Sequence, residues 1–109
     1  MTRRLTLTQL KKYDVSQKVL EALADAQSRA ILFSVIKEGK TAAELAEKHR
    51  IPLSSVYKKI SDLEDLSLIK VEKWMFSDNG KKFKIYKSRI SKADVSIRKP
   101  EPVISLYPN

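Results

Sequence analysis

Apolar side chains recur at helical spacing through the first two thirds of the chain. The first stripe consists of Val19, Leu20, Leu23 and Ala24. It predicts a helix that begins after Asp14, with Asp14 or Ser16 as the N-cap residue. A second helix is expected from Asp25, another favourable capping residue, to Gly39, a residue typical of helix ends. Residues 30–36 are apolar almost all round, which predicts that this second helix is buried.

A short third helix and a longer fourth helix follow, separated by a turn of three residues. Thr41 and Glu44 have the spacing of a capping box, so the third helix is expected to begin after Thr41 and to end near Arg50. The fourth helix is predicted over residues 53–66. Its inward stripe consists of Leu53, Val56, Ile60 and Leu63. Its outward side carries no acidic residue before Asp62.

An alternation typical of β-strands replaces the helical spacing after the fourth helix. Residues 69–76 and 82–87 are rich in β-branched and aromatic side chains, which predicts two strands. The dipeptide Asn79-Gly80 between them strongly favours a tight connection. The two strands are therefore expected to form an antiparallel hairpin with a basic tip.

Both ends of the chain have weaker patterns. Residues 1–12 are compatible with an arm, a short strand or the start of a helix. After Ile90, residues 93–98 are compatible with a third strand. The prolines beyond it predict an extended or partly disordered tail, because proline interrupts regular structure. These prolines are Pro100, Pro102 and Pro108.

This order of elements predicts a mainly α fold with a small β-hairpin, the winged helix-turn-helix. We expect an N-terminal arm over residues 1–12, a winged-helix domain over residues 13–90 and a C-terminal extension over residues 91–109. Within the domain, the helix-turn-helix is expected over residues 41–66 and the wing over residues 69–90.

The same region resembles two groups of prokaryotic regulators, the arsenical-repressor (ArsR-like) group and the multiple-antibiotic-resistance-repressor (MarR-like) group. Residues 41–69 carry the resemblance with the sequence TAAELAEKHRIPLSSVYKKISDLEDLSLI, and FSDNGKKFKIYKS resembles the wing of these proteins. With ADAQSRAILFSVIKEGK in front, the similarity covers roughly residues 20–90. Two positions depart from the pattern, because Arg50 and Ser67 stand where glycine is common. The resemblance implies a small transcriptional regulator of archaeal or bacterial type that binds double-stranded DNA as a homodimer.

The charge of the chain points to a polyanionic partner. The 109 residues carry a net charge of +9. Residues 70–109 contribute most of it, with ten basic and four acidic side chains. Residues 81–92 contain six lysines and arginines, no acid, and the aromatic residues Phe83 and Tyr86. Such a local excess favours nucleic acid first and an anionic membrane surface second.

Composition excludes several other classes of protein. Without cysteine, the chain has no disulfide and no thiolate metal site, and His49 alone makes no histidine metal site. Two glycines are too few for a glycine-rich nucleotide loop, and we find no catalytic constellation. We therefore expect no enzyme activity, metal or cofactor. The longest unbroken apolar run is residues 30–33, too short for a membrane span, so a cytoplasmic protein is expected.

The expected DNA contacts lie at the start of the fourth helix, at the start of the third helix and on the wing. They are Thr41, Ser54, Ser55, Tyr57, Lys58, Lys59, Lys81, Lys82 and Lys84. The fourth helix would enter the major groove, and the wing would meet the DNA backbone or minor groove. The outward positions hold no Arg, Asn or Gln, so we expect modest sequence specificity aided by DNA shape.

Each of these assignments has a structural alternative. The two serines are compatible with helix capping, Tyr57 with packing against the wing, and Lys81 and Lys82 with ordinary turn lysines. His49 is expected to be a partly buried helix residue, and Trp74 to pack in the wing or a dimer. The dimer contacts are expected at Val15, Val19, Leu23, Val95 and Ile97.

Two other functions stay open. One is a winged helix that binds protein partners in the transcription apparatus, and the other is RNA binding through the basic surface. The sequence does not identify an effector, an operator or the direction of regulation.

Overall fold

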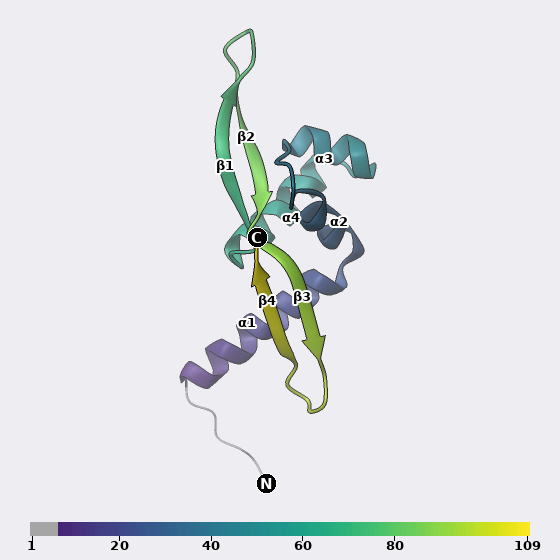
Figure 1. Cartoon of the computed structure of the whole chain (residues 1–109), viewed down its shortest axis with the longest axis vertical. Coiled ribbons are helices and arrows are strands. Elements are labelled where there is room, and N and C mark those ends of the chain that lie inside the picture. Colours follow the sequence, from purple (N-terminus) through teal and green to yellow (C-terminus); the bar gives the residue numbers. More distant parts are fainter. Residues whose placement is uncertain (1–6) are drawn as a thin grey trace.

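A computed structural model describes residues 7–109, and their side chains from residue 15 onward. The chain forms four helices followed by two β-hairpins (Figure 1). The elements are α1 (Leu7–Ala24), α2 (Ala26–Ser34), α3 (Ala42–His49), α4 (Leu53–Asp65), β1 (Ile69–Phe76), β2 (Lys82–Ser88), β3 (Ile90–Ser96) and β4 (Val103–Pro108).

The first helix is longer than predicted. It begins at Leu7, so residues 7–12 of the predicted arm are helical, and Asp14 and Ser16 lie inside the helix and not at its cap. No glycine or proline occurs before Gly39, so nothing in this stretch stops the helix from extending toward the N-terminus. Residues 1–6 of the predicted arm lie outside the described residues.

The second helix is shorter than predicted. It begins after Asp25, as expected, but it ends at Ser34 and not at Gly39. The chain then turns toward β2, where Lys40 and Tyr86 exchange two backbone hydrogen bonds of 3.1 and 2.8 Å. A Cβ on Gly39 would lie 2.5 Å from Cγ2 of Ile85. The glycine is therefore required by this close approach and not by a helix end.

The helix-turn-helix forms as predicted. Thr41 Oγ1 accepts a hydrogen bond from the Glu44 N–H, and Glu44 Oε1 accepts one from the Thr41 N–H, each at 3.1 Å. This capping box sets the start of α3. At the turn, Arg50 adopts the left-handed conformation with φ 54° and ψ 47°. That conformation explains why glycine is common at this position.

The predicted wing is confirmed as the antiparallel pair β1 and β2. Ile69 is opposite Ser88 at the base, and Phe76 is opposite Lys82 near the tip, with one irregularity between Val71 and Lys73. The loop between the strands closes with backbone hydrogen bonds from Ser77 to Lys81 and from Gly80 to Ser77, and Gly80 has a positive φ of 79°.

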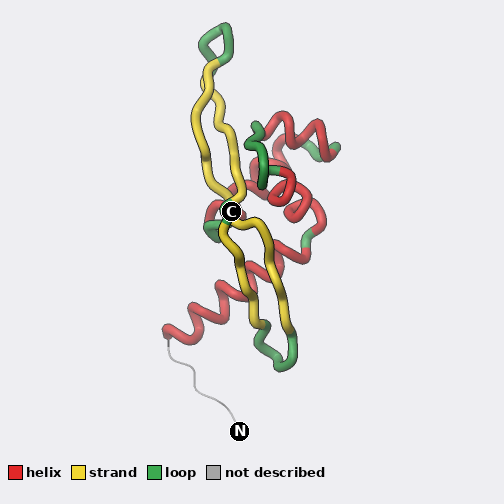
Figure 2. Tube along the Cα trace, in the orientation of Figure 1, coloured by secondary structure: helices red, strands yellow, loops and turns green. Residues whose placement is uncertain are grey.

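The possible third strand at residues 93–98 corresponds to β3. The prediction of an extended or partly disordered tail beyond it is wrong, because residues 103–108 form β4 and pair with β3 in a second hairpin. Ile90 pairs with Pro108, and Ser96 pairs with Val103. Pro100 and Pro102 lie in the loop between the strands, and β4 is an edge strand, so no proline removes an internal sheet hydrogen bond. The two hairpins extend in opposite directions from a common base, and the second one lies alongside α1 (Figures 1 and 2).

The core lies where the helices meet the bases of the hairpins. Its completely buried side chains include Ile31, Leu32, Leu45, Val56, Ile60, Leu63 and Leu68. Three of the four residues of the predicted α4 stripe belong to it. Leu53, the fourth, is 44% exposed, because it occupies the first position of α4 beyond the edge of the core. In residues 7–109, no helix has the length and apolarity required to cross a membrane.

Candidate nucleic-acid interface

The start of α4 presents a polar surface to solvent. Ser54 and Lys58 are exposed, Tyr57 is 52% exposed and Ser55 is half-buried. The N-cap residue of α4 is Pro52, and no side chain caps this helix. Helix capping therefore does not account for Ser54 and Ser55, and within the described residues their hydroxyls take part in no side-chain hydrogen bond.

Lys59 belongs to a different environment. Its Nζ atom lies 2.8 Å from Oδ2 of Asp25, in a partly buried ion pair. Asp25 also caps α2 by accepting hydrogen bonds from the backbone N–H and the hydroxyl of Ser28. The hydrogen bond from Lys59, followed by those from Ser28, lowers the pKa of Asp25 to about 2. Lys59 thus joins α4 to α2, and the structure does not bring it to the face formed by Ser54 and Lys58.

The wing carries the other predicted lysines. Lys81 is exposed at the tip. Lys82 and Lys84 lie on β2, with their Nζ atoms 4.1 and 5.1 Å from the centroid of the Trp74 ring. Trp74 is directly opposite Lys84 in the strand register. The indole therefore packs within the wing against two ammonium groups.

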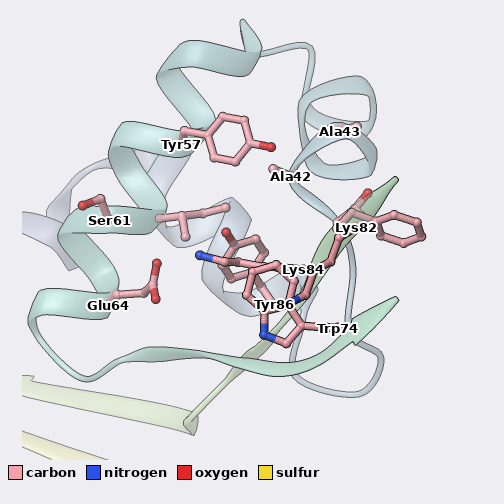
Figure 3. Close-up of a pocket in the computed structure, with 12 residues that line it drawn as sticks. Ala42, Ala43, Tyr57, Ser61, Glu64, Trp74, Lys82, Lys84 and Tyr86 are labelled. Carbon is pink, nitrogen blue, oxygen red and sulfur yellow. The ribbon is translucent and has the colours of Figure 1, made fainter. Parts of the chain in front are cut away.

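Four of the predicted contacts line one groove between the helix-turn-helix and the wing. They are Thr41, Tyr57, Lys82 and Lys84. The groove has a volume of about 590 Å³. In Figure 3, Tyr57 enters it from α4, and Trp74 and Tyr86 enter it from the wing. Burial first, and then the nearby Glu64 and Tyr57, raise the pKa of Tyr86.

Tyr86 and Glu64 are groove residues that were not predicted from the sequence, and Trp74 was expected to pack in the wing or a dimer rather than to contact a ligand. A signal was present for the wing residues, because Trp74, Lys82, Lys84 and Tyr86 share one face of the hairpin once its register is known. The sequence holds no comparable signal for Glu64, because its position in the groove depends on how α4 packs against the wing.

The remaining titratable and apolar candidates have structural roles. His49 is half-buried at the end of α3, and burial first, then Lys48, lowers its pKa. Over the described range, the structure contains no group of three or more potential metal ligands. Val19 and Leu23 are buried in the core of their own chain and so are not available for a dimer contact.

An exposed apolar surface lies on α1 and the second hairpin. Val15, Val95 and Ile97 of the predicted dimer contacts are exposed there, and the hairpin adds three more residues of the same kind. These are Val103, Leu106 and Tyr107. The strand register places Val95 and Leu106 on one side of the hairpin, with Ala93 and Ile104, and places Val103 and Tyr107 on the other side. We refer to these six residues together as the exposed apolar surface.

Comparison with solved structures identifies the fold as a winged helix-turn-helix. NolR from Sinorhizobium fredii is 21% identical, with a TM-score of 0.61 over 80% of this chain and 81% of NolR. Reduced HlyU from Vibrio cholerae is 16% identical, with a TM-score of 0.57 over 76% of this chain and 81% of HlyU.

A third similar structure is the Mb0332 domain from Mycobacterium bovis, described as a homodimeric winged helix-turn-helix DNA-binding domain of a possible ArsR-family regulator. It is 14% identical, with a TM-score of 0.59 over 80% of this chain and 75% of that domain. The predicted fold and the resemblance to ArsR-like proteins are thus confirmed at the level of architecture. No protein-family model matches the chain, and no curated protein matches it significantly.

Proposed function

We propose that the protein is a transcriptional regulator that binds double-stranded DNA with α4 in the major groove and the wing on the backbone. One observation carries this proposal: Tyr57 of α4 and Lys82 and Lys84 of the wing line the same groove. The recognition helix and the wing are the two elements that contact DNA in winged-helix proteins, and here both lie on the same side of the molecule.

The chemistry of this side suits a duplex. Lys81 and Lys82 supply positive charge for phosphates, which contribute affinity without sequence information. Ser54 supplies a short hydroxyl group, and Lys58 a long side chain with an ammonium group, for hydrogen bonds to base edges. Because the exposed start of α4 holds no Arg, Asn or Gln, sequence dependence would rest on these few contacts and on DNA shape.

We propose further that the regulator is a homodimer that joins through the exposed apolar surface of α1 and the second hairpin. Five of its six residues lie on the second hairpin or in its loop, at the opposite end of the molecule from the wing. A two-fold axis near this hairpin would leave both DNA-binding surfaces free, as reading two half-sites requires. The Mb0332 domain, which has a similar fold and is homodimeric, supports a homodimer.

The test is fluorescence anisotropy with labelled duplex DNA over a series of salt concentrations. We expect log K to fall steeply with log salt, with a slope of about −0.9 for each phosphate neutralised. Replacing Lys81 and Lys82 by Ala should reduce the slope by about 2 on every sequence. The matched control is the double change Arg98→Ala and Lys99→Ala in the second hairpin loop, which removes the same charge and should preserve the slope.

Three results would count against the proposal. Absence of duplex binding at low salt would reject DNA binding altogether. Tighter binding to single-stranded RNA than to duplex DNA would favour the RNA alternative. Equal slopes for the wing variant and the wild type would remove the wing from the contact.

A further inference from the structure

The tip of the wing carries an exposed aromatic side chain. Phe76 is 68% exposed, the highest fraction among the large apolar residues in the part of the chain that the structure describes. It is the last residue of β1, next to the loop that closes the wing. The wing extends beyond the helices at this end (Figures 1 and 2). A partner that buries this ring would gain free energy from the removal of apolar surface from water.

Phe76 lies on the face of the wing that borders the proposed DNA-binding groove. In the strand register Phe76 is opposite Lys82, and Trp74, two residues earlier, is opposite Lys84. Side chains two residues apart on a strand point to the same face of the sheet. Trp74, Lys82 and Lys84 line the groove beside α4. Phe76 therefore continues the same face toward the tip of the wing.

The ring of Phe76 is free, whereas the ring of Trp74 is covered. Although Lys82 is opposite Phe76, its ammonium group lies 4.1 Å from the centroid of the Trp74 ring. The ammonium group of Lys84 lies 5.1 Å from the same centroid. Over the described residues, no lysine packs on the Phe76 ring in this way. Trp74 thus holds two lysines in place, and Phe76 keeps its ring open to a partner.

The charge around this ring favours an anionic partner. Residues 73–93 contain seven lysines and arginines and one acid, Asp78 in the loop. Lys81 is exposed at the tip, next to Lys82. An apolar ring flanked by ammonium groups matches a groove of duplex DNA, in which stacked bases lie between two rows of phosphates. The ring would contact the bases, and the lysines would contact the phosphates.

The dimensions of the wing favour the minor groove. This groove is about 6 Å wide in B-DNA, too narrow for a two-stranded hairpin but wide enough for one side chain. From Ile69 to Phe76, β1 extends over about 23 Å at about 3.3 Å per residue. It is therefore long enough to span the half turn of about 17 Å that separates neighbouring grooves. With α4 in the major groove, the tip would reach the adjacent minor groove.

We propose that Phe76 inserts as an apolar wedge between neighbouring base pairs in the minor groove and bends the duplex there. This inference rests on the proposed function, because it assigns a further contact in the same DNA complex. Apolar side chains inserted in this way unstack a base step, and pyrimidine–purine steps such as TA are the easiest to kink. The wedge thereby adds sequence dependence to a complex whose exposed α4 positions hold no Arg, Asn or Gln.

The fluorescence of 2-aminopurine tests the wedge, because stacking quenches this base and unstacking raises its emission. The probe is a short duplex of alternating thymine and adenine, with 2-aminopurine in place of the central adenines. We expect the wild type to raise the emission when it binds. Phe76→Ala should remove this rise and weaken binding at least tenfold, with an unchanged salt slope because no charge is lost. On a stiff duplex of one adenine strand and one thymine strand, the loss should be less than threefold.

Two variants serve as controls. Met75→Ala removes a neighbouring side chain that is 40% exposed and points to the opposite face of β1. It should raise the emission and bind the duplex like the wild type. Phe76→Leu keeps an apolar wedge, so it should recover most of the emission and affinity that Phe76→Ala loses.

Specific results overturn the proposal. A full rise in emission with Phe76→Ala, or an equal loss with Met75→Ala, would reject Phe76 as the wedge. Tighter binding to single-stranded oligothymidine than to the duplex would also reject it, because the ring would then stack on separated bases. If no duplex is bound at low salt, the proposed function fails together with the wedge. If the duplex is bound with the expected salt slope but without a rise in emission, the wedge alone fails.

Discussion

Removing the charge of Asp25 tests whether Lys59 is a structural residue, as its geometry indicates. The carboxylate of Asp25 accepts hydrogen bonds from Ser28 at the start of α2 and from Lys59 of α4. Asp25→Asn keeps a good helix cap but removes the ion pair, whereas Asp25→Ala removes both. Comparing the two variants separates the contribution of Lys59 from that of the cap.

The structure sets the size of the effect. The pKa of Asp25 falls from 3.8 to about 2, which corresponds to an upper limit of roughly 2.4 kcal/mol at about 1.36 kcal/mol per pKa unit. The Asp25 side chain is 42% exposed, so solvent screening reduces this to about 1 kcal/mol. We therefore expect Asp25→Asn to lower the free energy of unfolding by about 1 kcal/mol at pH 7. Because Asp25→Ala also removes the helix cap, we expect it to lower the free energy of unfolding by about 2 kcal/mol.

The pH dependence has a definite sign. The pKa of Asp25 is lower in the folded state, so its stabilising contribution is complete above the unfolded value near 4. It is lost as the pH falls through the folded value of about 2. The difference in unfolding free energy between the wild type and Asp25→Asn should therefore be constant above pH 5 and should narrow between pH 4 and pH 2.

Urea unfolding followed by circular dichroism, repeated from pH 7 to pH 2.5, measures this difference. Asp78→Asn, an exposed position at the wing tip, is the control and should match the wild type within about 0.5 kcal/mol. Lys59→Met should destabilise the protein and leave the salt slope of DNA binding unchanged. The structural role of Lys59 would be refuted if Asp25→Asn were as stable as the wild type at pH 7. It would also be refuted if Lys59→Met reduced the salt slope of DNA binding.

Two other substitutions test the backbone geometry. Gly39→Ala places a Cβ 2.5 Å from Ile85 Cγ2 and 3.1 Å from the Tyr86 carbonyl oxygen, so we expect a loss of about 1–3 kcal/mol in urea unfolding; an unchanged midpoint would show that β2 moves aside freely. Arg50→Gly relieves the left-handed conformation at the turn and should raise the unfolding free energy by about 0.5–1 kcal/mol, whereas a decrease would mean that the Arg50 side chain stabilises the turn.

The helix-turn-helix and the wing could be predicted because their signals are local. The capping box of Thr41 and Glu44, the stripe of Val56, Ile60 and Leu63, and the Asn-Gly connection each act over a few residues. The left-handed conformation of Arg50 likewise follows from its position at a helix end. Such features depend on a few neighbouring residues and not on the position of the rest of the chain.

The wrong secondary-structure predictions lie where contacts between residues distant in the sequence determine the structure. Residues beyond the possible strand at 93–98 are predicted to form an extended or partly disordered tail, because their prolines dominate the local pattern. The pairing of β3 with β4 instead places each proline where no sheet hydrogen bond is lost. The end of α2 at Ser34 depends on the pairing of Lys40 with Tyr86, more than 40 residues away. No periodicity in the sequence contains that information.

The candidate interface shows the same division. The helical period correctly predicts that Ser54 and Lys58 are exposed, because this prediction depends on α4 alone. It does not reveal that Lys59 faces Asp25, since that contact depends on how α4 packs against α2. The groove is likewise a product of packing, because its walls come from α3, α4 and both strands of the wing.

The two hairpins share one anchoring point, and this has a consequence for the proposed dimer. Ser88 donates a backbone hydrogen bond to Val35, and Arg89 donates one to Leu68. The Asn109 side chain donates to the carbonyls of Ile36 and Ser88, each at 2.9 Å. The base of the second hairpin is thereby tied to the base of the wing. In a dimer joined through the second hairpin, this connection would fix the distance between the two DNA-binding surfaces, so one half-site spacing would be strongly preferred.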